Sequence, residues 1–513
     1  MSDPTGVVFP IDPTSGRRST TATGRAVVAD ALRGVDPVGA ASAERETNWR
    51  QGYLPHFRRL VEAGLTSPEA AHDIARRGLA SLHERMHWAG PTGDQPLESA
   101  FLAAANPAAT PAATPAAAPD ATASDATGRH TLAGPLGSET VHGEGTPDRV
   151  LSVPYAGERL SGDALHRRLD LWAQAGTLEP TCAEAVRLVI DNPEWLDLSD
   201  RTVVVLGAAA EMGPLRSLLR WGADVAAVDL PRRDLWDRLL GDTRKLAGSV
   251  TVPVRSGDGP LSARAGGDLV HDLGAVTSWV AGLAGPLVLG NYVYADGETN
   301  VRVSTAVDAL TQQVVRAKGR EDVALAFLAT PTDVFAVPGA DVERSVDSYA
   351  HRRTSKVLRV PLRTVSGGRL LRRNYVPGQD PGVNDSVVLQ QGPNYLLAKR
   401  LQRWRATAYR ADGGLVSFKV APPTRTRSVL KNRALAAAYA GAHRFGVEVF
   451  EPGTANTLMA ALLVHDLRTG SPALPAPWQD EAYAAVHGGL WTCAYDPRSA
   501  LGIAALLGIA SAR

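Results

Sequence analysis

Residues 201–232 read RTVVVLGAAAEMGPLRSLLRWGADVAAVDLPR, and this stretch decides the fold. An apolar run at Thr202–Leu206 leads into Gly207, and a second apolar run ends at Asp229. Between them, a helix is expected to open at Gly213. The order of apolar run, tight turn, helix and apolar run predicts a β-α-β unit with parallel strands.

The turn in this unit has the composition of a phosphate-binding loop. Gly207 permits a sharp turn, small side chains follow it, and a helix N-terminus offers unpaired N–H groups. Asp229 follows Gly207 by 22 residues, near the ~20 expected for a carboxylate that binds adenosine ribose hydroxyls. The predicted nucleotide contacts here are Gly207, Ala208, Ala209, Ala210, Glu211, Met212, Gly213, Asp229 and Leu230.

The charges of this unit bear on which nucleotide it takes. Glu211 stands where the dinucleotide fingerprint has its middle glycine, so a carboxylate would face the phosphates unless it points away. Asp229 and Glu211 together favour NAD(H), while Arg232 and Arg233 keep NADP(H) possible. The alternative interpretation is a Rossmann-like structural unit without a cofactor.

Further apolar runs alternate with amphipathic helical segments after residue 198. They are Val225–Val228, Leu287–Tyr292, Val323–Leu328 and Val416–Val420. Continuous apolar runs of this length are typical of strands buried on both faces. The predicted fold class is α/β, a Rossmann-like doubly wound parallel sheet with a mainly helical N-terminal extension.

Composition shifts suggest the following organisation. Residues 1–34 are predicted to be a flexible tail, and residues 35–195 a helical extension with an Ala/Pro-rich linker at 103–127. The Rossmann-like domain is expected at 196–470, with a basic insertion at about 331–385. Residues 471–513 form a C-terminal tail expected to pack on the domain or on a partner subunit, which suggests a homo-oligomer.

A second motif is Tyr395-Leu-Leu-Ala-Lys399. With 11 tyrosines and 6 lysines in 513 residues, the Tyr-x-x-x-Lys spacing is expected about 0.13 times by chance. On a helix the two side chains share a face. A lysine ammonium beside a phenol would lower the phenol pKa and let the tyrosine exchange a proton near neutral pH.

The surroundings of this motif resemble the short-chain dehydrogenase/reductase family. The Tyr-x-x-x-Lys helix is followed by the strand Leu415–Val420 and by Ala421-Pro-Pro-Thr-Arg-Thr426, similar to the family's Ala-Pro-Gly-x-x-Thr loop at the nicotinamide. The resemblance covers residues 196–467, and it implies an NAD(P)-dependent oxidoreductase that interconverts a carbonyl and an alcohol. It adds Asp268, Leu269, Asn291, Pro422, Thr424 and Thr426 as cofactor contacts.

The same resemblance assigns catalytic roles. Tyr395 would be the general acid/base, and Lys399 would lower the tyrosine pKa and hold the nicotinamide ribose. The family's serine ends the fifth strand; here Thr330 stands there, and Ser386, nine residues before Tyr395, is the other candidate hydroxyl. Tyr349 is rejected as the acid because its i+4 residue is Arg353 and it lies far from the Pro422 loop.

Overall charge argues against a protein built around nucleic acid or an anionic membrane. Lys and Arg number 54 against 53 Asp and Glu, giving a net charge of +1. Residues 348–379 nevertheless hold eight basic residues and no acid, which suggests a lid selecting an anionic small-molecule substrate or a solvated surface. The absence of a signal segment or an apolar span predicts a cytoplasmic protein.

The sequence is also compatible with two other functions. The same fold could serve a non-redox lyase or isomerase, or a nucleotide-binding regulatory protein. His83-Glu84-Arg85-Met86-His87 matches the helical His-Glu-x-x-His of zinc hydrolases, but no third ligand follows. With only two cysteines no multi-cysteine zinc site is possible, and the expectation is no bound metal.

Overall fold

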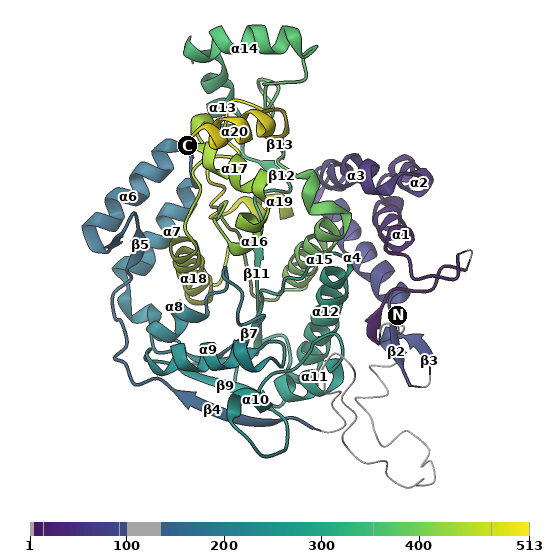
Figure 1. Ribbon diagram of the computed structural model, residues 1–513, viewed down its shortest axis with the longest axis vertical. Helices are drawn as coiled ribbons and strands as arrows, with labels where there is room; N and C mark the ends of the chain where they lie inside the picture. The colour runs from purple at the N-terminus through teal and green to yellow at the C-terminus, as the bar shows by residue number, and fades with distance from the viewer. Residues whose placement is uncertain are drawn as a thin grey trace.

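A computed structural model describes residues 5–13, 15–91, 93–99, 135–351, 353–472 and 474–511. Its centre is a seven-stranded sheet flanked by helices (Figure 1). In spatial order the strands are β14 (Val416–Val420), β11 (Val323–Ala329), β10 (Leu287–Asn291), β7 (Thr202–Leu206), β8 (Asp224–Val228), β9 (Ser249–Val254) and β4 (Gly137–His142). The predicted α/β class and the five predicted strands are confirmed.

All strands except β4 run parallel. Numbered along the chain from β7, the parallel strands follow the order 3-2-1-4-5-6 of a doubly wound sheet, in which the crossovers diverge between β7 and β10. Asn291 at the end of β10 lies opposite Leu206 of β7 and Phe327 of β11. The loops after these three strands therefore meet at one edge of the sheet, where ligands bind in such folds.

Successive residues of each strand enter different cores because side chains alternate across a sheet. Val204 and Leu206 join one core, while Val203 and Val205 join the other. The first core holds α11 (Leu273–Ala281), α12 (Glu298–Lys318) and α15 (Gly392–Ala411). The second holds α7 (Pro180–Asp191), α8 (Leu215–Arg220), α9 (Arg233–Arg244) and α18 (Pro452–Thr469).

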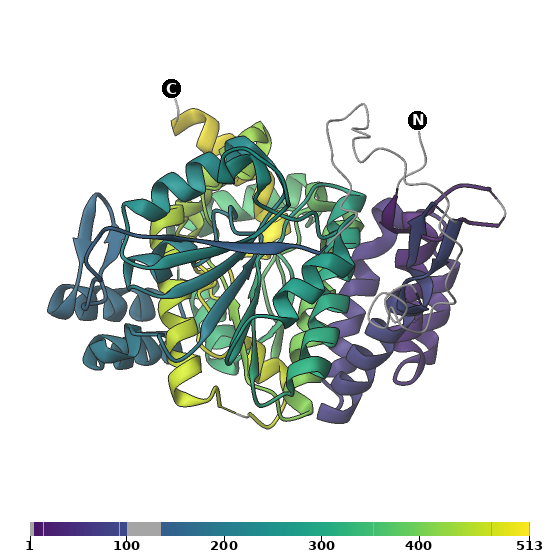
Figure 2. The same cartoon turned by 90° about the horizontal axis from the view of Figure 1, so that it is seen from below.

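The N-terminal helices form a further layer over α12 and α15. These are α1 (Thr20–Arg33), α2 (Pro37–Arg45), α3 (Trp49–Gly64) and α4 (Pro68–Arg85), and Figures 1 and 2 place them on the opposite side of the molecule from α6 (Gly162–Ala175) and α7. Gly78 of α4 allows a close approach, since a Cβ there would come within 2.4 Å of the Trp404 ring of α15. The extension is thus part of the body that covers the sheet.

One prediction about residues 1–195 differs from the structure, and one strand of the sheet is not among the predictions. Residues 20–33, expected in a flexible tail, form α1, whose apolar face is buried and whose first turn is capped by Ser19. β4, which continues the sheet antiparallel to β9, was not expected. The 103–127 linker lies outside the described residues.

The basic insertion contains a small antiparallel pair and two helices. β12 (Val334–Val337) pairs with β13 (Gly382–Asp385), and between them lie α13 (Gly339–His351) and α14 (Arg353–Val365), which projects at the top of Figure 1. The C-terminal segment adds α19 (Pro477–Ala482) and α20 (Pro497–Ser511), and α20 packs on α17 (Arg433–Gly441). No described helix combines the length and the apolar character needed to cross a bilayer.

A buried ion-pair network fixes α15 against the rest of the molecule. The Asp333 carboxylate lies 3.3 Å from Arg400 Nη2 and 3.0 Å from Arg403 Nη1. Arg403 also pairs with Glu481 at 2.5 Å. Asp333 is 1% exposed and both arginines are buried, so each charge depends on its partners.

Replacing Asp333 with alanine should therefore destabilise the protein strongly. Removing one partner leaves buried guanidinium charges uncompensated, which costs about 3–5 kcal/mol of unfolding free energy. Urea denaturation would measure this loss. The control is Asp237→Ala, which breaks the exposed Arg233–Asp237 pair. It should change the unfolding free energy by less than about 1 kcal/mol. Equal losses of stability in the two variants would contradict this account.

Candidate active site

Tyr395, Lys399 and Thr330 meet where β11 ends. The Thr330 hydroxyl interacts with the Tyr395 phenol and lowers its pKa. Lys399 Nζ donates to the Leu328 carbonyl at 3.3 Å, so the lysine lies against the same strand end. All three side chains are partly exposed, which leaves them within reach of a ligand.

Asn291 joins this cluster through a residue that sequence reasoning missed. Gln402 Nε2 donates to Asn291 Oδ1 at 3.2 Å, and Lys399 Nζ donates to Gln402 Oε1 at 3.2 Å. Gln402 follows Lys399 by three positions, so both lie on one face of α15. The amide thus connects the end of β10 to the lysine.

The second hydroxyl candidate, Ser386, is placed differently. It is 2% exposed, and its Oγ donates to Asn384 Oδ1. Thr330 instead bonds to Thr332 at 2.8 Å, and Gln391 Nε2 donates to Thr332 Oγ1 at 2.7 Å. The structure therefore brings Thr330 to Tyr395 and holds Ser386 in a separate hydrogen bond.

The electrostatics of the pair differ from the prediction. Burial raises the pKa of the Tyr395 phenol to about 12; hydrogen bonds with Thr330 and Gln391 oppose this, and the charge of Asp333 adds to it. Burial lowers the pKa of the Lys399 ammonium to about 8, against the attraction of Asp333. The expected lowering of the phenol pKa by Lys399 is wrong for this state, because burial dominates the phenol pKa and Lys399 is not among the groups that shift it.

The loop after β7 has the expected sharp turn but a later helix. Gly207 has φ +84, and a Cβ there would lie 3.0 Å from the backbone of Tyr292 and Val293, so only glycine fits. Ala208 is buried, and Ala210 and Gly213 form successive turns. The helix α8 begins at Leu215, with Pro214 at its N-cap, so the prediction that Gly213 opens it is wrong.

Asp229 is bound by the loop itself. Its two oxygens accept the Ala209 N–H at 2.8 Å and the Leu230 N–H at 2.7 Å. Burial raises the pKa of this carboxyl above its usual value, while these two N–H groups oppose the shift. The nearby Arg232 and Arg233 pair with Asp234 and Asp237. The two guanidinium groups that would favour the 2′-phosphate of NADP(H) therefore already have carboxylate partners.

Glu211 connects two loops across the edge of the sheet. Its carboxylate accepts the Arg427 backbone N–H at 2.8 Å and pairs with Arg427 Nε at 2.9 Å. Its carbonyl accepts from Asn456 Nδ2 at 3.3 Å. Glu211 therefore points away from its own loop and toward the loop after β14.

The remaining predicted contacts have local partners. Asp268 accepts the Val270 N–H at 2.9 Å and lies 2.9 Å from His271 Nδ1, and neighbouring Leu269 is buried. In the loop after β14, the Thr424 hydroxyl donates to the Pro422 carbonyl, and Thr426 caps α16 (Arg427–Lys431). Met212 packs against the second core.

The zinc-hydrolase motif does not have the helical geometry that its sequence predicts. α4 ends at Arg85, and His87 begins the strand β2 (His87–Gly90), so the two histidines are not on one helical face. His83 Nε2 instead contacts Asp308 Oδ2 at 2.6 Å, and Arg405 binds the same carboxylate at 2.6 and 2.7 Å. His83 thereby joins the N-terminal layer to α12 and α15.

Several arginines of the basic insertion have partners within the protein. Arg359 lies over the Tyr349 ring at 3.9 Å, and Arg363 Nη1 donates to the Tyr349 hydroxyl at 2.8 Å. Arg373 also faces this ring, and Arg372 pairs with Asp496. Tyr349 is thus surrounded by guanidinium groups well away from Tyr395 along the chain.

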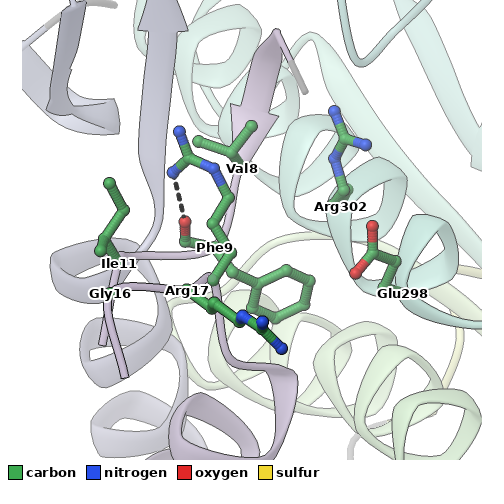
Figure 3. A pocket seen from close by; sticks show the side chains of 8 residues that line it. Val8, Phe9, Ile11, Gly16, Arg17, Glu298 and Arg302 are labelled. Carbon is green, nitrogen blue, oxygen red and sulfur yellow. Dashed lines mark hydrogen bonds between the residues drawn. The ribbon is translucent and has the colours of Figure 1, made fainter. Parts of the chain in front are cut away.

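Hollows are present in two regions of the structure described above. One lies where the N-terminal segment meets α12, lined by Val8, Phe9, Ile11, Gly16, Arg17, Arg18, Glu298 and Arg302 (Figure 3). Arg302 donates there to the carbonyls of Val7 and Thr5. The other, termed the apolar pocket, includes Thr332, Ser386, Pro423 and Tyr439 and so adjoins the Tyr395 cluster.

Three buried groups could in principle ligate a metal. Ligand atoms of Glu179, Asp341 and His487 lie within 4.8 Å of one another. However, His487 Nδ1 accepts the Gly489 N–H at 3.1 Å, so the proton of a neutral ring is on Nε2, facing Glu179 Oε1 at 3.1 Å. That tautomer offers no lone pair to a metal, and we interpret the cluster as a proton-sharing group.

A search of family models, of curated proteins and of solved structures finds no match to this chain.

The proton-sharing cluster predicts a pH dependence of stability. Burial raises the pKa of Asp341 to about 8 and that of Glu179 to about 6, and burial lowers the pKa of His487 to about 4. Between about pH 6.5 and 8 the unfolded chain has released the Asp341 proton that the folded chain retains, so stability falls as pH rises.

Asp341→Asn should remove this fall, because the amide has no proton to lose. The variant is expected to be more stable than the parent at pH 8 by about 1 kcal/mol or more, and closer to it at pH 6.5. Thermal melting at the two pH values measures the difference. Asp347→Asn on the same helix is the control, and an equal gain at both pH values would contradict the interpretation.

Proposed function

We propose that the chain is a nicotinamide-dependent oxidoreductase that interconverts a carbonyl and an alcohol, with Tyr395 as the proton donor. The observation that supports this best is the gathering of Tyr395, Thr330 and Lys399 at the end of β11. This edge is the ligand-binding edge of a doubly wound sheet. The Thr330 hydroxyl comes from the end of β11, whereas the phenol and the amine come from α15, and a surface Tyr/Lys pair would not require this third group.

In the proposed reaction the protein manages the proton. With a pKa near 12 the Tyr395 phenol is protonated at neutral pH, so it is suited to donate to a carbonyl oxygen. The Thr330 hydroxyl would donate a second hydrogen bond to that oxygen. The Lys399 ammonium, one helical turn away, would stabilise the phenolate that forms, and the phenolate would regain its proton from solvent.

The dinucleotide, when bound, would supply the hydride that attacks the carbonyl carbon. The Gly207–Gly213 loop, with its glycine-only turn, fits a pyrophosphate that approaches the backbone closely. Asp229 at the end of β8 fits the ribose hydroxyls, and Lys399 with Asn291 fits the nicotinamide end. The Asp229 carboxylate and the paired state of Arg232 and Arg233 favour NAD(H) over NADP(H).

One observation favours a second candidate, a non-redox protein on the same fold. Glu211 and Arg427 bridge the loops after β7 and β14, and a pyrophosphate would lie between such loops. A chain that keeps this bridge closed would be a lyase, an isomerase or a regulatory protein. Cofactor binding separates the two candidates.

Tyr395→Phe should lower carbonyl reduction by about 10²–10⁴-fold, because the proton donor is lost while the ring remains. The decrease in NADH absorbance with an aldehyde substrate measures the rate, and fluorescence titration should show unchanged NADH binding. Tyr349→Phe, the matched control, should keep full activity. Full activity in Tyr395→Phe would remove Tyr395 from the mechanism.

NADH should bind at least about tenfold more tightly than NADPH, because a 2′-phosphate would meet the Asp229 carboxylate. Asp229→Asn should narrow that difference, whereas Asp224→Asn, at the opposite end of β8, should leave it unchanged. Fluorescence titrations with both cofactors provide the constants. If neither cofactor binds at millimolar concentration, the second candidate is favoured.

A further inference from the structure

The apolar pocket lies beside the proposed proton donor. Thr332 lines it and is hydrogen-bonded to Thr330, which in turn bonds to Tyr395. Tyr439 also lines it, and the proximity of Tyr395 helps raise the Tyr439 pKa, after burial. A molecule in this pocket would thus be placed next to the catalytic cluster.

The walls of the pocket are mainly apolar side chains from separate segments. They come from residues 387–388, from α17, from residues 445–449 and from α20, and they leave a space of about 80 Å³ for the centres of water-sized molecules. Aliphatic groups such as Ala438, Val447, Leu490 and Leu501 dominate this lining. Such walls favour an apolar ligand, because a polar one would lose hydrogen bonds to water without replacement.

Two polar atoms in the lining have no hydrogen-bond partner among the described residues. The Tyr495 hydroxyl belongs to a side chain that is only 4% exposed, and Arg498 Nε is the second such atom. Buried donors without partners are rare in folded proteins because each carries a desolvation cost. Both can donate, so the group that would satisfy them is an acceptor oxygen.

The charge at this position indicates a neutral acceptor. Arg498 Nη2 already donates to Asp385 Oδ2 at 2.5 Å, so the guanidinium charge is balanced before a ligand enters. Within the pocket lining, Arg498 is the only lysine or arginine. A carboxylate would therefore bring an uncompensated charge into an apolar space.

We propose, on the basis of the function proposed above, that this pocket binds the substrate and that the substrate is an apolar ketone or aldehyde carrying a second, neutral acceptor oxygen. Its reacting carbonyl lies toward Thr330 and Tyr395. Its second oxygen accepts from the Tyr495 hydroxyl and Arg498 Nε. The expectation of an anionic substrate held by the basic insertion is replaced by this neutral one.

Calorimetric titration of the full chain tests the proposal with three probes. These are decan-2-one, decane-2,9-dione and 9-oxodecanoate, which carry no second acceptor, a neutral one and an anionic one. The dione should bind about tenfold more tightly than either other probe, as one added buried hydrogen bond implies. Tyr495→Phe should reduce the dione affinity to that of decan-2-one. Tightest binding of 9-oxodecanoate, or no preference among the probes, would overturn the proposal.

Two leucines of α20 provide a matched pair of variants. Leu501→Trp fills the pocket and should abolish binding of all probes, whereas Leu506→Trp, at a position 69% exposed, should change nothing. If Leu501→Trp fails to fold, Val449→Trp fills the same space from another segment. Unchanged binding in a folded pocket-filling variant would overturn the proposal.

The assay separates the pocket from the redox function. Probe binding without NADH oxidation would support the proposed pocket and contradict the proposed oxidoreductase function. Conversely, the chain could reduce acetaldehyde in a Tyr395-dependent way without binding any of the ten-carbon probes. That result would support the oxidoreductase function and contradict the proposed substrate class.

Discussion

The structure depends on the burial of α15 between the sheet and the N-terminal helices. An amphipathic surface helix would leave its charges in water, but Arg400 and Arg403 of α15 are buried and the Arg405 side chain is only 16% exposed. Each has a carboxylate partner: Asp333 for the first two and Asp308 for the third. Charges in such surroundings persist only when they are paired.

This burial explains both the extension and the chemistry of the site. The N-terminal helices cover α15, and His83 of α4 completes the Asp308–Arg405 pair, so a motif that resembles a metal site contributes to packing instead. Within α15 itself, burial raises the pKa of Tyr395 and lowers that of Lys399. At neutral pH the phenol is therefore protonated and the lysine, with a pKa of about 8, is still mainly an ammonium, which suits proton donation to a carbonyl.

The strands could be predicted because parallel strands buried on both faces are continuous apolar runs. β4 could not, since its polar residues lie at the sheet edge and carry no such run. α1 could not be predicted because it contains Thr and Gly, which have low helix propensity, and its burial against other helices outweighs that propensity. The end of α4 at Arg85 depends on the pairing of His87 in β2, which is not encoded locally.

In the candidate site, too, some residues could be predicted from the sequence and others could not. The spacing of Tyr395 and Lys399 predicts their common face, and the end of β11 predicts Thr330 beside them. Gln402, Thr332 and Asp333 were missed because their roles arise only when distant segments meet. Glu211 was recognised as a departure, but its partner Arg427, 216 positions away, could not be identified from sequence.

The pH profile of carbonyl reduction tests the central claim that burial sets the chemistry of this pair. With NADH and an apolar ketone at saturation, the rate should be constant at low pH and fall as pH rises through about 8, because Lys399 loses the charge that stabilises the phenolate. A rate that stays level or rises between pH 7 and 9.5, measured by NADH absorbance and corrected for stability, would contradict this account.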